Sequence, residues 1–411
     1  MIPYVKGYDN PIDIPANIRD ADVIVGVPSR NTAHTIGYVL HNIIEGFNKY
    51  LPGKKYAIIV CDGLSNDGTP GVVRVLRRKL GENIVLIPNV RAPGKGAAIR
   101  TIIELTNDYS NASMLVFFDS DLRSITPEWV VLMVKGIEKC GYVTPYYIRH
   151  KYDATITNFI ARPLTTIAYG IDIKQPIGGD FALNRELVEI LARSPLWTSN
   201  PWTQLFGVDI FLTHTALANN VDVCEAFLGV KIHEAKDPAV SLKNMFIEVT
   251  GSLFTVLIEY DNVWSNMRLD QINTPHLIDE PRPPIMSPTE IRVDPNRALA
   301  EFHKGLNEYK EFYETIFSKE LVRRLYSNNV YNYGIDADTW LDVLAEAYKS
   351  FRKDPHHYMR IKILESLFGL WQGRLYRYYN ETWDKGTVEA LRRIDEYVRA
   401  YYGKRDIFFE H

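Results

Sequence analysis

The sequence predicts an α/β protein in which helices cover both faces of a mostly parallel sheet, followed by a helical C-terminal domain. Apolar runs alternate with helical segments from residue 21 to residue 148. The runs are continuously apolar, which is typical of parallel strands buried on both faces. Beyond residue 296, Leu, Tyr and Trp recur at helical spacing. Because the chain has 411 residues, we expect more than one domain.

Each element of the first half has its own local signal. Apolar runs within 21–31, 55–69, 83–89, 113–121 and 142–148 predict strands. Between them, 32–51, 70–81, 94–106 and 127–141 predict helices, and Pro70 suits a first helical turn. Residues 158–270 mix helix and strand patterns, and 273–290 is Pro-rich, which indicates a linker or long connection. We expect an arm over 1–20, an α/β domain over 21–270, and a linker with a helical domain over 271–411.

Composition excludes several classes of protein. The net charge is −3 and the charges are dispersed, so no general nucleic-acid surface is expected. The N-terminus lacks the apolar stretch of a signal peptide, and no apolar run reaches the roughly 18–20 residues of a membrane span. Cys61, Cys140 and Cys224 show neither metal nor disulfide spacing, which favours a reducing compartment. We therefore expect a soluble cytoplasmic protein.

Two carboxylates, Asp119 and Asp121, follow the apolar run "LVFF". Strand-end turns often contain Asp, so turn chemistry alone is one interpretation. In a parallel sheet, however, ligands bind at the carboxyl ends of strands. Two carboxylates there repel unless a cation lies between them, and Mg²⁺ or Mn²⁺ binds such oxygens together with substrate phosphates. This pattern predicts a divalent metal and a diphosphate substrate.

The stretch "APGKGAA" (92–98) supports a phosphate-containing ligand. Gly94 and Gly96 permit close backbone approach, and Lys95 offers a point charge; a plain turn with a surface lysine is the alternative. The spacing fits neither a Walker A motif nor G-x-G-x-x-G, which disfavours a P-loop kinase and a dinucleotide-dependent oxidoreductase.

Four further residues end or interrupt apolar runs. Asp62 can accept hydrogen bonds from a nucleobase or ribose, and Asp180 follows a Gly pair that suits a ligand or a tight turn equally. Asp209 lies among apolar neighbours and needs a partner or a function. His233 ends "LGVKIH" and is either a third metal ligand or a satisfied histidine.

The order of these motifs resembles that of GT-A glycosyltransferases, and more narrowly the mannosylglycerate and glucosylglycerate synthases, with glucosyl-3-phosphoglycerate synthase as a relative. The motifs are "VPSRN", "CDGLSNDGT", "PGKGAA", "FFDSD", "QPIGGDFA", "GVDIF" and "GVKIH". The stretch "RHKYDATITNFIARPL" (149–164) resembles the acceptor loop of mannosylglycerate synthase. The resemblance implies a donor half over 21–125 and an acceptor half over 126–270.

The resemblance also implies a role for individual residues. It implies that Asp119, Asp121 and His233 bind the metal and that Asp209 acts close to the reacting centre of the sugar. The implied donor-binding residues are Pro28, Ser29, Asn31, Asp62, Lys95, Gly96, Ser120 and Asp180. The implied acceptor-binding residues are Arg149, Asp153, Ala154, Thr155, Ile156 and Thr157. Whether Asp119 contacts the metal or the ribose stays open.

Departures from the family pattern narrow the substrates. Thr32 stands where many GT-A enzymes have Glu, and Asp180 where Glu is usual. Thr155 replaces an Arg of the phosphoglycerate enzymes, which favours free D-glycerate because Arg forks suit phosphate. Lys236 replaces a tyrosine near the sugar of mannosylglycerate synthase, which weakens the assignment of mannose. The donor stays open between GDP-mannose and GDP-, UDP- or ADP-glucose.

The resemblance implies a retaining, metal-dependent hexosyltransferase that makes a compatible solute from a nucleotide sugar and D-glycerate, as a dimer or tetramer. The alternatives are transfer to 3-phosphoglycerate, to another small hydroxy acid or to a polyprenyl phosphate. A nucleotidyltransferase is disfavoured because "VPSRNTA" after the first strand lacks glycine. A non-catalytic sugar-nucleotide-binding protein is also disfavoured, because metal, donor and acceptor motifs occur together.

Overall fold

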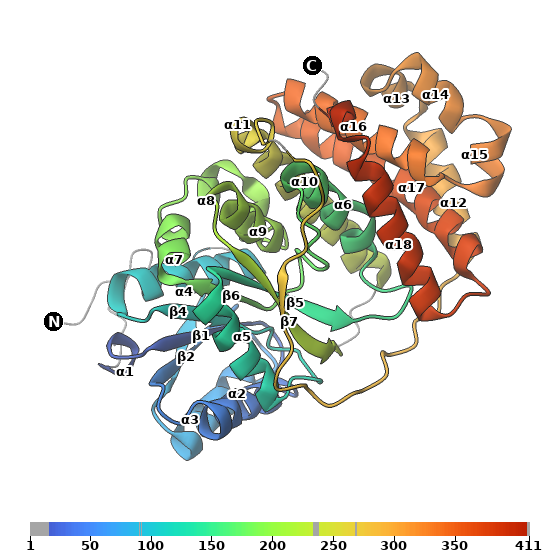
Figure 1. Cartoon of the computed structure of the whole chain (residues 1–411). Coiled ribbons are helices and arrows are strands. Elements are labelled where there is room, and N and C mark those ends of the chain that lie inside the picture. The colour runs from blue at the N-terminus through green and yellow to red at the C-terminus, as the bar shows by residue number, and fades with distance from the viewer. Residues whose placement is uncertain (1–15, 90, 92, 233–237, 268, 409–411) are drawn as a thin grey trace. The chain divides into compact units, whose positions relative to one another are not determined.

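An eight-stranded sheet is built from strands that lie between residues 23 and 278 (Figure 1). The structure is a computed structural model that describes residues 16–89, 91, 93–232, 238–267 and 269–408. The strand order is β3-β2-β1-β4-β6-β5-β7-β8. The strands are β1 Val23–Ser29, β2 Tyr56–Asp62, β3 Ile84–Pro88, β4 Met114–Phe117, β5 Tyr142–Ile148, β6 Phe181–Asn184, β7 Val223–Val230 and β8 His276–Ile278.

Within this sheet, β6 runs antiparallel to its neighbours β4 and β5, and the other described pairs are parallel. Every residue of β1 and β4 is buried, as the continuous apolar runs predict for strands covered on both faces. The predicted mostly parallel α/β sheet is therefore confirmed.

Helices cover both faces of this sheet (Figure 1). On one face α2 and α5 pack together over alternate side chains of β1, such as Val23, Val25 and Val27, with α3 beside α2. On the other face α4 contacts β1, β2, α7 and α9. These helices are α2 Ile36–Tyr50, α3 Thr69–Leu80, α4 Lys95–Tyr109, α5 Pro127–Lys139, α7 Arg185–Ala192 and α9 Val208–Ala218; shorter elements are α1 Ala16–Arg19, α8 Leu196–Ser199 and the 3₁₀ turn η2 Pro201–Gln204.

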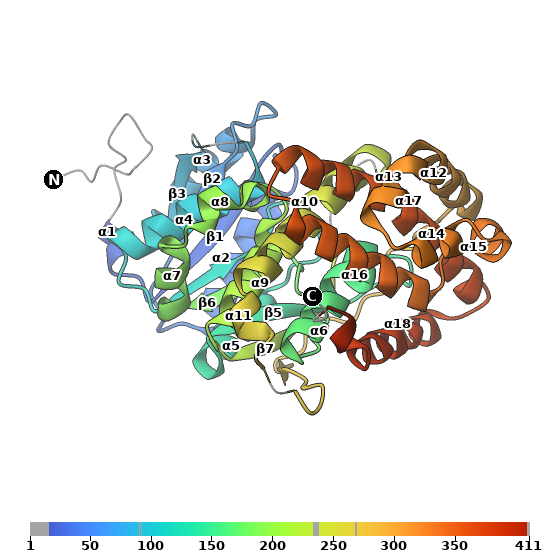
Figure 2. The same cartoon turned by 90° about the horizontal axis from the view of Figure 1, so that it is seen from above.

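The remaining described elements are almost entirely helical, as the sequence predicts for residues beyond 296. In this part α17 contacts α12, α10 and α16 (Figure 2). Gly305 of α12 and Gly369 of α17 allow close packing, since a Cβ on Gly305 would lie 2.9 Å from Cα of Gly369. The elements are the π-helix η1 Thr157–Ala161, α6 Arg162–Tyr169, α10 Pro238–Glu259, α11 Asp261–Trp264, α12 Pro295–Glu308, α13 Lys310–Ile316, α14 Lys319–Leu325, α15 Asn328–Tyr333, α16 Ala337–Lys353, α17 His357–Thr382, α18 Thr387–Tyr402 and η3 Arg405–Phe408.

The chain divides into two compact units. The first contains residues 1–148, 173–236 and 275–288 and holds the sheet; the second contains 149–172, 237–274 and 289–411. The segment that carries the predicted acceptor residues therefore belongs to the second unit. None of the described helices has the length and apolar character that crossing a lipid bilayer requires.

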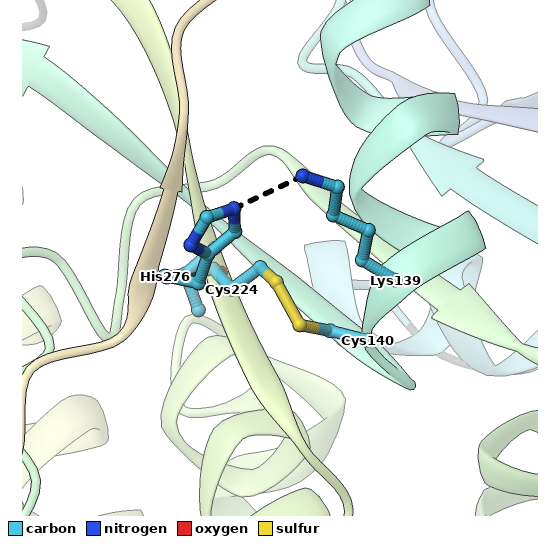
Figure 3. Close-up of a disulfide and its surroundings, with 5 residues drawn as sticks. Lys139, Cys140, Cys224 and His276 are labelled. Carbon is cyan, nitrogen blue, oxygen red and sulfur yellow. Dashed lines mark hydrogen bonds between the residues drawn. A yellow bond between two sulfur atoms is a disulfide. The ribbon is translucent and has the colours of Figure 1, made fainter.

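A disulfide joins Cys140, which caps the C-terminus of α5, to Cys224 in β7 (Figure 3). Their Cα atoms are 5.8 Å apart although 84 positions separate them in sequence. Beside them, Nζ of Lys139 lies 3.1 Å from Nε2 of His276, which pairs with Cys224 in the register of β7 and β8. The expectation that the cysteines form no disulfide is wrong, because the pairing depends on how α5 packs on β7. The cysteines therefore give no support for a reducing compartment.

Candidate active site

Parallel strands bring polar side chains to one edge of the sheet. Pro28 is buried one residue before the end of β1, and the final residues Ser29 of β1 and Asp62 of β2 are paired in register. Asp119 lies two residues beyond the end of β4, and Lys95 begins α4 after β3. Because the carboxyl ends of parallel strands lie at the same edge, these residues lie at the edge of the sheet where such folds bind ligands.

The predicted donor residues Ser29, Asn31 and Asp62 belong to one hydrogen-bonded turn. The hydroxyls of Ser29 and Ser65 donate to Oδ1 of Asp62 at 3.1 and 2.6 Å, and the Ser65 N–H donates to Oδ2 at 2.9 Å. Asn31 has a positive φ of 53°, and its N–H donates to Oγ of Ser65 at 2.7 Å. Its side-chain oxygen accepts from the N–H of Asn66 at 3.0 Å. The Asp62 carboxylate thus fixes the turn, and contact with a nucleobase stays a prediction.

Three carboxylates and two ammonium groups form what we call the strand-end cluster: Asp119, Asp180, Asp209, Lys95 and Lys231. Nζ of Lys95 lies 2.9 Å from Oδ1 of Asp119 and 3.4 Å from Oδ1 of Asp209. Nζ of Lys231 donates to Oδ2 of Asp119 and to Oδ2 of Asp180, each at 2.7 Å. The Asp119 N–H donates to Oδ1 of Asp180 at 2.8 Å. Each carboxylate oxygen of Asp119 therefore faces a different lysine.

Lys231 is the member of this cluster that the sequence analysis missed. Its side chain is 5% exposed, and Nζ also donates to the carbonyl of Gly178 at 2.9 Å. The hydroxyl of Tyr147 donates to the same oxygen of Asp180 that Lys231 contacts. A usable signal was present, because a lysine at the end of the buried run of β7 must find a counter-ion.

Glycines of the two predicted ligand turns admit the protein's own chain. A Cβ on Gly96 would collide with the carbonyl oxygen of Thr203, and one on Gly94 with that of Gln204. Gly179 has a φ of 88°, and a Cβ there would collide with the Asp119 carboxylate. The sequence predicted ligand approach at Gly94 and Gly96; close packing of α4 on residues 203–205 is the reason that the structure gives.

The three acids of the cluster differ in the direction in which their pKa values shift. Burial alone would raise the pKa of Asp119, but the ammonium groups of Lys231 and Lys95 outweigh it and hold that pKa well below its usual range. Burial raises the pKa of Asp180 and that of Asp209. Oδ1 of Asp209 is buried and makes no hydrogen bond, since the 3.4 Å to Lys95 exceeds a normal hydrogen-bond length. Asp209 thus has an oxygen that a ligand hydroxyl could satisfy.

The carboxylate oxygens of Asp119 and Asp121 are ligands that suit a hard divalent cation, which can also bind substrate phosphates. Asp121 is half-buried, and the intervening Ser120 is fixed by its carbonyl, which accepts from the Thr35 hydroxyl at 2.9 Å. His233, the predicted third ligand, lies outside the described residues and stays a prediction. Among the residues that the structure describes, no three His, Cys, Asp or Glu side chains gather as metal ligands would.

The predicted acceptor residues form a turn of their own in the second unit. Nη1 of Arg149 pairs with Oδ2 of Asp153 at 3.0 Å, and Oδ1 of Asp153 accepts from the N–H of Ala154 at 2.7 Å. Ala154 has a positive φ of 51°. Thr155 and Ile156 are buried, as is Thr157, which begins η1. The acceptor role of this turn stays a prediction.

Comparison with known proteins finds similarity over part of the chain. Residues 57–254 match the family model described as "Mannosylglycerate synthase, GT domain". Mannosylglycerate synthase of Rhodothermus marinus is 26% identical over 196 residues, 45% of this chain and 45% of that protein. Glucosyl-3-phosphoglycerate synthase of Mycolicibacterium smegmatis is 27% identical over 59% of this chain and 80% of that protein. Residues 57–254 therefore resemble the glycosyltransferase domain of mannosylglycerate synthase.

The extent of these matches is limited. The chain matches about half the length of two mannosylglycerate synthases, 45% of that from Rhodothermus marinus and 50% of that from Selaginella moellendorffii. One similar solved structure is glucosyl-3-phosphoglycerate synthase from Mycobacterium tuberculosis in complex with Mn²⁺, UDP-glucose and phosphoglyceric acid. It has 24% identity and a TM-score of 0.45 over 57% of this chain and 79% of that chain. These relatives are glycosyltransferases.

Proposed function

We propose that this chain, whose glycosyltransferase domain resembles that of mannosylglycerate synthase, transfers a hexose from a nucleoside-diphosphate sugar to the 2-hydroxyl of D-glycerate. The observation that carries the proposal is Lys95, which bridges Asp119 and Asp209 at 2.9 and 3.4 Å. One of these acids belongs to the D-x-D pair expected at the diphosphate, and the other is expected beside the sugar. Lys95 thus lies between the acid expected at the leaving diphosphate and the acid expected at the sugar, the two groups that the breaking bond joins.

The donor nucleotide lies, in this proposal, along the ends of β1 and β2, where Ser29, Asn31 and Asp62 form their turn. Lys95 faces the diphosphate and offsets negative charge that develops on the leaving group. Lys231 holds Asp119 and Asp180 in place from the protein interior, since its side chain is 5% exposed. The buried position of Lys231 suits a positioning role better than direct contact with substrate.

A divalent metal, Mg²⁺ or Mn²⁺, is proposed to be held by Asp119, Asp121 and His233 together with the substrate phosphates. Such an ion supplies Lewis-acid stabilisation of the leaving diphosphate. The two oxygens of Asp119 already face Lys95 and Lys231. We therefore infer that Asp121 is the stronger carboxylate ligand and that Asp119 mainly orients the two lysines.

In the proposed reaction the 2-hydroxyl of the acceptor attacks the anomeric carbon from the face that the leaving group occupies. The bond from that carbon to the phosphate oxygen breaks, and the departing phosphate takes the hydroxyl proton, so the nucleoside diphosphate leaves and configuration is retained. Asp209 positions sugar hydroxyls or stabilises positive charge at the anomeric carbon. A covalent role is less favoured, because Oδ1 of Asp209 faces the ammonium of Lys95 at 3.4 Å, which offsets the charge of that oxygen.

The acceptor turn favours free glycerate over 3-phosphoglycerate. Nζ of Lys151 donates to the carbonyls of Thr382, Trp383 and Lys385 at 2.8, 3.2 and 2.6 Å, so it is committed to the protein. Burial and the charge of Lys151 lower the pKa of His150, which keeps its ring neutral near pH 7. Arg149 is then the cation of this turn that can pair with one small carboxylate.

The test is a panel of donors and acceptors. GDP-mannose, GDP-glucose and UDP-glucose are each incubated with D-glycerate or 3-phosphoglycerate and with Mn²⁺ or Mg²⁺, and products are identified by mass spectrometry. We expect a hexosyl glycerate from at least one donor. A preference for 3-phosphoglycerate would contradict the acceptor assignment. The cytoplasmic location and the assembly as a dimer or tetramer stay predictions, and light scattering on the purified protein measures the assembly.

A further inference from the structure

A cavity of about 460 Å³ lies wholly within the second unit, among α10, α12, α17 and the segment before α12. Figure 2 shows these helices. Its size is that of a small-molecule site, which usually measures about 300–1,000 Å³. All of its lining residues beyond α10 lie outside residues 57–254, the part that resembles a glycosyltransferase domain. The proposed reaction therefore does not account for it.

The inner wall of the cavity combines side chains that accept hydrogen bonds with an aromatic ring. Glu301 of α12 and Glu365 and Gln372 of α17 line it and are half-buried. Neither glutamate forms a salt bridge with another described residue. Phe368 lines the same wall, and Nζ of Lys243 lies 6.0 Å from its ring centroid. Half-buried carboxylates without an ion partner are best satisfied by groups that donate hydrogen bonds, such as hydroxyls.

The rim of the cavity carries several basic side chains together with the exposed carboxylate of Glu308. Arg292, Arg297 and Lys304 line it and are exposed, and in the described part of the chain none of them forms a salt bridge. The nearby carboxylate of Asp294 caps α12, where it accepts from two backbone N–H groups at 3.0 and 3.3 Å. Its charge is thus already engaged by the helix end. A carboxylate or phosphate on a ligand would pair with these cations.

We propose that this cavity binds an anionic sugar derivative, a hexose that carries a carboxylate or a phosphate. Sugar hydroxyls donate to Glu301, Glu365 and Gln372, the apolar face of the sugar ring packs on Phe368, and the anionic substituent pairs with cations of the rim. The proposal rests on these lining residues and not on the proposed reaction.

The experiment is isothermal titration calorimetry on the full chain in EDTA, which keeps metal from the strand-end cluster. The probes are glucuronate, glucose 6-phosphate, neutral glucose and inorganic phosphate. We expect at least one of the two charged sugars to bind about tenfold more tightly than glucose or phosphate alone, because only a charged sugar satisfies both the wall and the rim. Whichever charged sugar binds identifies the anion.

Variants localise the binding. Arg297→Gln and Glu365→Gln should each weaken it by about tenfold, since each loses one charge-assisted hydrogen bond. Arg323→Gln, at an exposed site on α14 outside the cavity, is the matched control and should bind as the wild type does. Melting temperatures verify that all variants are folded. The proposal is overturned by equal affinity for glucose or phosphate, by no binding heat, or by binding that survives both cavity variants.

Discussion

Nζ of Lys231 lies 2.7 Å from the carboxylate of Asp119 and 2.7 Å from that of Asp180, with its side chain almost wholly buried. This ammonium is therefore the internal counter-ion of two acids at the end of the central strands. Repulsion between those acids is offset by the protein itself, before any metal or substrate binds. The geometry at the D-x-D pair is accordingly a property of the folded chain.

Replacing Lys231 by Met should destabilise the protein strongly. The methionine matches the length of the aliphatic stem but leaves the buried Asp180 without its cation and Asp119 with Lys95 alone, and a broken buried pair costs roughly 3–5 kcal/mol. Urea unfolding followed by circular dichroism measures the change. Lys79→Met, at an exposed site on α3, is the control and should change stability by less than about 0.5 kcal/mol.

Adding Asp180→Asn to Lys231→Met should restore part of that loss, because the amide removes the buried charge that has lost its cation. Its oxygen can still accept from the Asp119 N–H, as Oδ1 of Asp180 does at 2.8 Å. A double-mutant cycle gives the interaction free energy. Strictly additive losses would contradict the assignment of Lys231 as the counter-ion of Asp180.

Gly96→Ala should disturb the start of α4. The new methyl group would collide with the carbonyl of Thr203, so residues 203–205 or Lys95 must shift. We expect lower stability and a weaker affinity for nucleotide sugar, measured by unfolding and by calorimetry. Gly71→Ala is the matched control, because its Cβ meets no atom within 4 Å and alanine suits a helix better by about 0.5–1 kcal/mol. Equal effects of the two substitutions would be inconsistent with this packing.

Reducing the disulfide between Cys140 and Cys224 should lower the melting temperature. The bond closes a loop with a separation of 84 residues, and removing such a constraint typically costs about 2–4 kcal/mol. Melting curves with and without reductant measure the effect. The double variant Cys140→Ser, Cys224→Ser should melt at the reduced temperature in both buffers. An equal wild-type melting temperature with and without reductant, under conditions in which the unfolded chain is reduced, would contradict this prediction.

Stability should fall between about pH 6.5 and pH 3 partly because of His214. Burial lowers the pKa of this fully buried ring to about 3, so the unfolded chain takes up a proton that the folded chain refuses. The contribution is complete above the unfolded pKa and is lost as pH falls toward the folded one, at about 1.4 kcal/mol per pH unit. Unfolding free energies at several pH values give the slope. His214→Gln should reduce it by about one proton, and an unchanged slope would contradict the prediction.

Much of the site could be predicted because its residues carry local signals. Asp119, Lys95 and Asp62 stand next to strand or helix ends, so the alternating pattern alone placed them at one edge of the sheet. Asp209 was conspicuous as an acid among apolar neighbours. These signals depend on short segments, which the sequence displays directly.

Other features depend on contacts that are distant in sequence. Lys231 contacts Asp119 and Asp180, which are 112 and 51 residues away in sequence, and the motif "GVKIH" does not indicate which residues it will contact. The disulfide depends on how α5 meets β7 over 84 residues. Glycine at position 96 was predicted to make room for a ligand, whereas in the structure it makes room for the backbone carbonyl of Thr203. Partner choice of this kind follows from packing, which no short motif encodes.

The central claim is that the strand-end cluster transfers a sugar with the help of a divalent metal that Asp121 binds. The most direct measurement is hexosyl glycerate formation by the wild type and by Asp121→Ala, each with Mn²⁺ or with EDTA. Circular dichroism verifies that both chains are folded. We predict product from the wild type with metal and only background from the other three reactions. Full turnover in EDTA, or full turnover by Asp121→Ala, would contradict the claim.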